Sequence, residues 1–149
     1  MKTKIILAIV FCIVFLLIIG LIAFSVFTLS CGLLENKMCE YYSDDNNYQQ
    51  VRGVVTETVN EHVIVVEILS DSEDFTKYGN KVQFEICSNE SVGRQIMVGD
   101  NIEFISAPKY FYNGHKLPIV QIVLDDIEYL DFLDGKEFLL AKIVKAKGG

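Results

Sequence analysis

Hydrophobic and polar positions divide this chain into four stretches. Residues 5–29 are 25 consecutive uncharged positions, most of them Ile, Leu, Val, Phe or Ala. Residues 30–50 become polar and show no apolar period, which is typical of a linker beside a membrane. Residues 51–124 contain short apolar–polar alternations separated by turn residues, which indicate β-strands. Residues 125–149 fit helix and strand about equally and form a C-terminal extension.

The uncharged stretch at 5–29 is long enough to cross a membrane as a single helix. At a rise of about 1.5 Å per residue it spans roughly 37 Å, whereas the hydrocarbon core of a bilayer is about 30 Å thick. Its apolar side chains occupy every side of the helix, which argues against a helix lying in the membrane interface. We therefore predict a transmembrane anchor at 5–29 that follows a short N-terminus at 1–4.

Two processed forms stay open as alternatives to this anchor. The apolar core of a signal peptide is usually about 7–15 residues long, shorter than this stretch, although Ala23-Phe24-Ser25 would serve as a cleavage site. A lipoprotein is the second alternative, because Ser30 and Cys31 follow the apolar stretch and partly match a bacterial lipobox. In that form a lipid on Cys31 tethers the domain.

Charges on either side of the anchor predict its direction. Lys2, Lys4 and the amino terminus are positive, whereas the other side has Lys37 among several carboxylates. Positively charged flanks stay in the cytoplasm. We expect a single-pass protein of the cell membrane with a cytoplasmic N-terminus and an extracytoplasmic C-terminal domain.

Two cysteines lie just after the anchor. In an oxidising compartment, Cys31 and Cys39 are candidates for a structural disulfide that closes a small loop. Their spacing matches no zinc motif, and no second pair accompanies them, so a metal site is disfavoured. Two free thiols are a third option. Cys87 ends a strand-like stretch and is expected to be a half-buried thiol without a role of its own.

Strand signals recur every 8–12 residues between residues 51 and 124. The stretch at 81–87 alternates strictly between apolar and polar residues and is the clearest of them. Asn113-Gly114 is a signal for a type I′ hairpin turn, and Pro108 and Pro118 are expected at strand ends or edges. The predicted strands are 51–59, 63–69, 81–87, 101–106, and the two arms of the hairpin at 109–112 and 115–124.

This order of strands resembles the OB-type barrel, over residues 51–124. The resemblance is one of pattern: a long first hairpin, a single alternating strand, then a turn into a closing hairpin. Gly53 interrupts the first strand and would let it bend across both sheets of such a barrel. The fold class is therefore predicted as one transmembrane α-helix followed by a small all-β domain, with a β-sandwich as the alternative.

Two alternatives are open for residues 125–149. Asp134-Gly135 is a turn signal that would pair 127–133 with 137–144 in a hairpin. Alternatively, Asp125-Asp126 caps a short helix that ends near Gly135, and 138–144 then forms a strand or a second short helix.

The charge of the chain limits its partners. The formal charge is −7, and without Lys2 and Lys4 the rest of the chain carries −9. A domain this acidic repels phosphate backbones and anionic headgroups, so we expect no nucleic-acid partner.

Signatures of catalysis, cofactors or metals are missing from the sequence. There is no H-E-x-x-H, C-x-x-C, Walker or G-x-G-x-x-G motif and no nucleophile elbow. The two histidines, His62 and His115, fall at predicted turns. We therefore predict that the protein is not an enzyme and carries no cofactor and no metal.

The most suggestive stretch for binding surrounds the predicted hairpin tip. In OB folds, loops of this kind place aromatic side chains against ligands; the alternative is that these aromatics fill the core or shield an edge strand. The leading hypothesis is a membrane-anchored, non-catalytic module that binds or scaffolds a protein of a cell-envelope complex, or an accessory subunit of one. The alternative is a domain that binds a small ligand or a glycan. The candidate binding residues are Lys109, Tyr110, Tyr112, His115 and Lys116.

Overall fold

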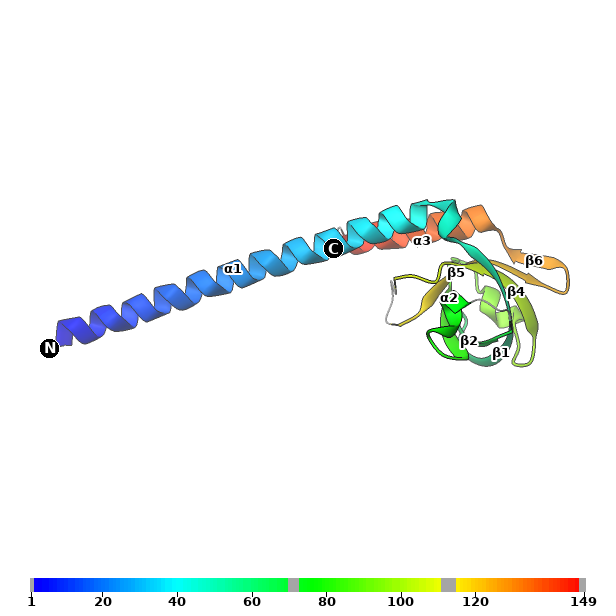
Figure 1. The fold of residues 1–149 in the computed structure, drawn as a ribbon, viewed down its shortest axis with the longest axis horizontal. Coiled ribbons are helices and arrows are strands. Elements are labelled where there is room, and N and C mark those ends of the chain that lie inside the picture. Colours follow the sequence, from blue (N-terminus) through cyan, green and yellow to red (C-terminus); the bar gives the residue numbers. More distant parts are fainter. Residues whose placement is uncertain (1, 70–72, 111–114, 148–149) are drawn as a thin grey trace. The chain divides into compact units, whose positions relative to one another are not determined.

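Contacts within the chain divide it into two units, Met1–Asn36 and Lys37–Gly149. The structure, a computed structural model, describes residues 2–69, 73–110 and 115–147, without the side chains of residues 2–10, 28, 30, 31, 94 and 147. Figure 1 shows the elements in chain order.

Helix α1 (Lys2–Ser43) supplies the whole first unit and the first residues of the second. Every side chain from residue 11 to residue 27 is exposed, and the part Phe11–Ser43 is long and apolar enough to cross a membrane. Its place near the N-terminus fits a signal sequence equally. Most of the predicted linker at 30–50 is helical, because residues 33–40 are mainly Leu, Glu, Lys and Met, which favour helix. Asp44 then caps the 3-10 helix η1 (Asp45–Asn47).

Six strands form one sheet in the second unit. In spatial order they are β3-β2-β1-β4-β5-β6, and β3 also pairs in parallel with β5. This extra pairing closes the first five strands into a barrel, which is the topology of an OB fold. The predicted barrel is confirmed, and the β-sandwich is excluded. The strands are β1 (Gln49–Asn60), β2 (Val63–Ile68), β3 (Lys81–Ile86), β4 (Asn101–Ser106), β5 (Leu117–Leu124) and β6 (Ile127–Leu130).

Gly53 has the role expected from its place within the first strand. It pairs with Ile68 of β2 and with Ile102 of β4, so β1 is shared by both sides of the barrel at this residue. A Cβ atom on Gly53 would lie 2.3 Å from Val66 Cγ1 and 2.7 Å from the carbonyl oxygen of Glu67. Only glycine allows the two strands to approach this closely.

Buried apolar side chains fill the barrel interior. Phe84 lies at its centre, with ring centroids 6.2 Å from Phe75 of the short helix α2 (Glu73–Thr76) and 4.9 Å from Phe104 of β4. The helix η2 (Val92–Gln95) joins β3 to β4, and its Val92 belongs to the same cluster. Inward-facing residues of every barrel strand complete this core, as the alternating patterns predicted.

The closing hairpin differs from its prediction. Residues 109 and 110 are not in a strand, and Tyr110 has a φ of 59°, far from extended backbone. The predicted turn at Asn113-Gly114 lies outside the described residues. β5 pairs instead with β4 along one edge and with β3 near its start. The start of β5 therefore pairs with β3 to close the barrel, instead of pairing with residues 109–112 in a local hairpin.

Each alternative for the C-terminal extension is met in part. Residues 127–130 form a strand, as the hairpin alternative expects, and residues 138–144 are helical, as the other alternative allows, but neither predicted turn nor cap is where it was expected. Asp125 and Asp126 form the tight turn between β5 and β6, with φ of 51° and 63° as a type I′ turn requires. Helix α3 (Phe132–Lys147) begins after Asp131, whose carboxylate accepts the backbone N–H of Leu133 at 2.9 Å. Gly135 lies within this helix. The position requires glycine, because a Cβ there would be 2.1 Å from the carbonyl oxygen of Val120 in β5.

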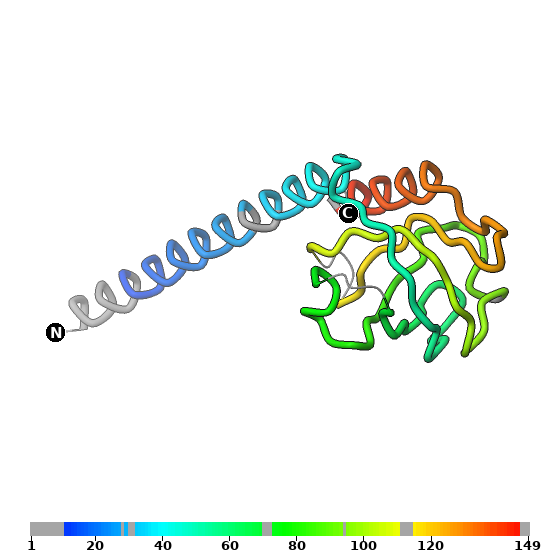
Figure 2. Tube along the Cα trace, turned by 45° about the vertical axis from the view of Figure 1, so that its right-hand side comes forward, coloured from blue at the N-terminus to red at the C-terminus, as the bar shows by residue number. Residues whose placement is uncertain are grey.

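Helix α3 and the last residues of α1 cover the outside of the barrel beside β5 and the end of β3. Figure 2 shows α3, in red, running along the outside of the β-strands. A second apolar cluster, called the outer layer here, lies beneath these helices. Its buried members are Met38, Tyr42, Cys87, Ala107, Val120, Leu139 and Ile143.

Candidate functional site

The predicted aromatic site is partly used for packing. The Tyr110 ring lies edge-on to Tyr41, with centroids 5.3 Å apart, and the Lys109 ammonium sits 5.5 Å from the Tyr41 centroid and 5.2 Å from that of Tyr110. The buried Tyr42 hydroxyl donates to the carbonyl oxygens of Lys109, at 2.9 Å, and of Tyr110. Lys109 and Tyr110 thus secure the loop before β5 to residues 41–42.

The other predicted binding residues are placed differently. His115 is exposed, with a φ of 64°, and Lys116 is half-buried just before β5. Tyr112 lies outside the described residues. The structure does not bring these side chains into one described cavity with Tyr110, and their part in binding stays a prediction.

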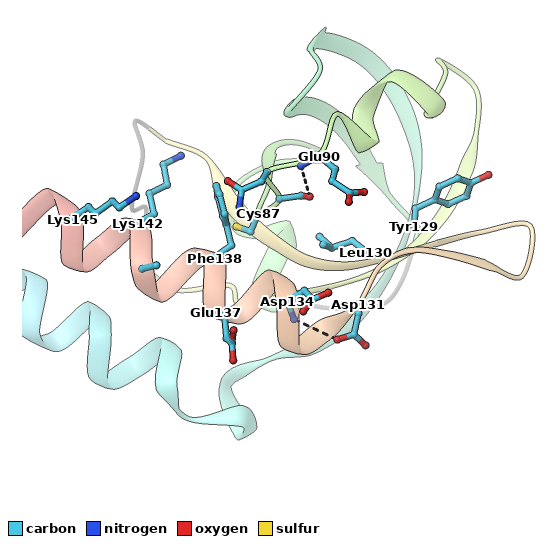
Figure 3. Close-up of a pocket in the computed structure, with 13 residues that line it drawn as sticks. Cys87, Glu90, Tyr129, Leu130, Asp131, Asp134, Glu137, Phe138, Lys142 and Lys145 are labelled. Atoms are coloured by element: carbon cyan, nitrogen blue, oxygen red, sulfur yellow. Dashed lines mark hydrogen bonds between the residues drawn. The ribbon is translucent and has the colours of Figure 1, made fainter.

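A groove on the outside of the barrel is the better candidate. Its volume is about 620 Å³, and it is lined by residues 87–90 after β3, residues 129–131 at the end of β6, and the side of α3 from Asp134 to Lys145. Figure 3 shows Leu130 and Phe138 pointing into the space beside Cys87. These three side chains make the floor apolar.

Strand topology explains why the groove exists. β3 and β6 lie along the same edge of β5, β3 beside residues 117–119 and β6 beside residues 122–124. Beyond β3, Cys87 donates its backbone N–H to Ile119 at 2.9 Å, and the chain then turns away. The groove opens where these two segments part. β6 ends the sheet and, among the described strands, pairs with β5 alone.

Carboxylates dominate the rim of the groove. Glu90 comes from the segment after β3, and Asp131, Asp134 and Glu137 come from the start of α3 (Figure 3). Asp131 and Asp134 also favour the helix, because negative charge is stabilising at a helix N-terminus. Within the described parts of the chain, none of these four carboxylates pairs with a cation. The rim is therefore available to an external positive charge.

One ion pair lies under α3, next to the groove. Lys142 binds Glu85 of β3, whose side chain is only 8% exposed. The Lys142 ammonium also lies 6.0 Å from the centroid of Phe138. Because Glu85 occupies Lys142, this lysine does not neutralise the carboxylates at the other end of the groove. Lys145 is the further cation of the lining.

The cysteines differ in their surroundings. Cys87 is fully buried, with its thiol 3.8 Å from the carbonyl oxygen of Glu85. Cys39 is a half-buried free thiol, and the side chain of Cys31 lies outside the described residues. Residues eight apart in a helix are separated by about 12 Å, whereas a disulfide holds Cα atoms about 4.4–6.8 Å apart. The predicted Cys31–Cys39 disulfide therefore requires α1 to open between them.

Among the side chains that the structure describes, no three His, Cys, Asp or Glu residues come together in a way that could hold a metal ion. The carboxylates of the groove rim act as separate surface charges rather than as a cage.

Sequence patterns did not reveal the groove. Its walls come from segments about 40 residues apart, and only the parting of β3 and β6 brings them together. Glu85 is one of the polar positions of the alternating stretch 81–87, yet its side chain is buried, with Lys142 of α3 against it. The spacing of Asp131 and Asp134 at the start of a helix was the one local signal.

Comparisons with known proteins add little to this geometry. No protein-family model matches the chain, and no curated protein matches it. A crystal structure of Ag(I)CusF is similar to it at 16% identity and a TM-score of 0.34, covering 52% of this chain and 97% of that one. A likeness this distant carries no argument about function. The OB assignment rests on the strand pairings above.

Proposed function

We propose that this protein is a membrane-anchored, non-catalytic binding module whose barrel unit holds another protein at the surface of a cell membrane. The observation that carries the proposal is an open groove on the outside of a filled barrel. Side chains occupy the barrel interior, so a ligand has to bind outside it. An apolar floor with a charged rim is typical of surfaces that bind proteins.

Helix α1 supports the anchoring half of the proposal. Its apolar side chains are exposed on all sides from residue 11 to residue 27, and exposure of so much apolar surface to water is strongly unfavourable. Burial in a bilayer removes that cost. Lys2 and Lys4 at the N-terminal end of the helix favour a cytoplasmic N-terminus, with the barrel unit on the outer side. The natural partner is then a protein of the cell envelope.

Alkaline carbonate extraction of native membranes tests the anchor. We expect the full-length protein to stay in the membrane pellet, with an intact mass that includes residues 1–30. Release into the supernatant, or a mass that starts after residue 25, would show a cleaved signal peptide. A mass that starts at Cys31 with an added lipid would show the lipoprotein form, in which the barrel is still tethered.

Crosslinking in native membranes tests the binding half. A photoreactive amino acid is placed in turn at exposed positions over the barrel unit, and covalent adducts are identified by mass spectrometry. We expect the same envelope protein from a contiguous set of positions. Absence of protein adducts at every position would contradict the proposal.

A further inference from the structure

We infer that the groove binds an extended, basic segment of the partner protein, which adds to the free edge of β6 as an extra strand. This inference rests on the proposed function, since it names the surface that the partner occupies and the chemistry of the bound segment. The pairing of β6 and the charge of the rim support it independently.

The free edge of β6 is the first support. An edge strand presents a row of N–H and C=O groups to which an extended peptide pairs. In the described structure, residues 127–130 make no backbone hydrogen bond outside their pairing with β5. The end of this strand, with Tyr129 and Leu130, forms one wall of the groove. A segment that enters the groove therefore meets unpaired backbone on its β6 side.

The floor suits the side chains of such a strand. Successive side chains of an extended segment point to opposite faces. One set would face the apolar floor of Leu130, Phe138 and Cys87, and the other set would face the rim. An apolar–basic alternation matches this division.

Charge selects the kind of occupant. Glu90, Asp131 and Asp134 stand on the rim near the end of β6, and no cation of the described chain neutralises them. Lysine or arginine side chains complement this rim. A second copy of the chain does not, because Lys37–Gly149 contains 11 Lys and Arg against 19 Asp and Glu. The occupant is therefore a basic segment of a different protein.

Two alanines of α3 provide a matched test in the full-length protein in native membranes. Ala141 and Ala146 are both exposed, but only Ala141 lines the groove. A photoreactive amino acid at each position, followed by sequencing of the crosslinked peptides, shows what lies there. We expect adducts from Ala141, and few from Ala146, on a lysine- or arginine-rich segment of one protein.

Charge variants then test the rim. Glu90→Lys with Asp134→Asn raises the net charge by three, and so does the control Glu57→Lys with Glu67→Gln on exposed positions of β1 and β2. We expect the crosslinking yield from Ala141 to fall about fivefold or more in the groove variant, because the modest contributions of several exposed ion pairs to binding add up. The yield should stay unchanged in the control variant. If Asp134→Asn disturbs α3, the single variant Glu90→Lys, at a position outside any helix or strand, should still lower the crosslinking yield from Ala141.

Three results would overturn the inference. Adducts on a segment without basic residues contradict the charge argument, and equal losses in both charge variants do the same. Protein adducts from other barrel positions but none from Ala141 contradict the groove while the proposed binding function stands. Only the absence of protein adducts everywhere would overturn that function as well.

Discussion

The barrel interior and the outer layer are both apolar clusters, but they are built differently. The interior consists of aliphatic residues and phenylalanines held between strands, with Phe84 packed against Phe104. The outer layer contains Tyr42, and the half-buried Tyr48 packs against it; both hydroxyls donate to backbone carbonyl oxygens. A partly buried ion pair between Glu85 and Lys142 lies beside this layer. Polar groups in a packed layer fix its geometry, because each needs a specific partner. The interior thus makes the barrel, and the outer layer fixes where α3 and the end of α1 lie.

This difference implies two separable steps of unfolding. Loss of interior packing should unfold the whole unit, whereas loss of outer-layer contacts should release α3 and leave the barrel intact. Release of α3 would also remove one wall of the groove. The variants below test that separation.

Phe84→Ala is expected to have the largest effect. Phe84 is fully buried at the centre of the interior, and removal of a buried phenylalanine costs about 3–5 kcal/mol. Urea unfolding of the detergent-solubilised protein should show one lower midpoint by near-UV and far-UV circular dichroism alike. Val59→Ala, at an exposed position of β1, is the control and should change the midpoint little. Loss of helix signal alone in Phe84→Ala would contradict the separation.

Gly135→Ala should release α3 without unfolding the barrel. The new Cβ would meet the Val120 carbonyl oxygen at 2.1 Å, and overpacking of this kind costs about 1–3 kcal/mol. Hydrogen exchange should accelerate in α3 while β1–β4 stay protected. Gly32→Ala is the matched control, because this helical glycine has nothing within 4 Å of the added Cβ. Equal acceleration throughout the unit would show that the two clusters unfold together.

Lys142→Met should have a smaller effect of the same kind. It leaves the Glu85 carboxylate buried without its cation. A fully buried pair broken in this way costs about 3–5 kcal/mol, and we expect about 1–2 kcal/mol because the Lys142 side chain is 38% exposed. Thermal melting compares this variant with Lys145→Met, an exposed lysine one turn later. Equal melting temperatures for both variants would show that the ion pair between Lys142 and Glu85 does not stabilise the fold.

Tyr48→Phe tests the outer layer through the pH dependence of stability, without changing the barrel interior. The Tyr48 hydroxyl donates to the Tyr42 carbonyl oxygen at 2.8 Å, and loss of this bond should cost about 1 kcal/mol at neutral pH.

Burial, with smaller contributions from Cys87, Asp45 and Tyr41, raises the pKa of Tyr48 above its ordinary 10.0. Below pH 10 the phenol is neutral in both states, and above it the unfolded state ionises first, so stability falls as pH rises from 10 towards the folded pKa. Because burial also raises the pKa values of Tyr41 and Tyr42, Tyr48→Phe should make that fall shallower without removing it in urea titrations at pH 9–11. If stability falls equally steeply with pH in the variant, groups other than Tyr48 cause the fall.

Much of the barrel could be predicted because its strands carry their own pattern. The alternation from residue 81 onward and the boundaries 101–106 follow from burial of one face of each strand. Gly53 was recognised because a glycine within a strand indicates a bend or a close approach. These features depend on residues near one another in the sequence.

The outer layer and the groove depend on contacts between distant residues. The sequence predicts a turn at Gly135, but a glycine is required there because the backbone of β5 lies against the helix. One alternative predicts a helix cap at Asp125-Asp126, whereas these residues turn the chain between two strands. Local signals are the same in both settings, so only the packing of α3 on the barrel distinguishes them.

The measurement that tests the central claim most directly is hydrogen exchange of the β6 amides at residues 127–130. The protein is labelled once in native membranes, where its partner is present, and once after purification into lipid nanodiscs. If a partner strand adds to β6, these amides exchange slowly in native membranes and fast in nanodiscs, while β2 is equally protected in both. Equal exchange of β6 in the two samples would contradict the account.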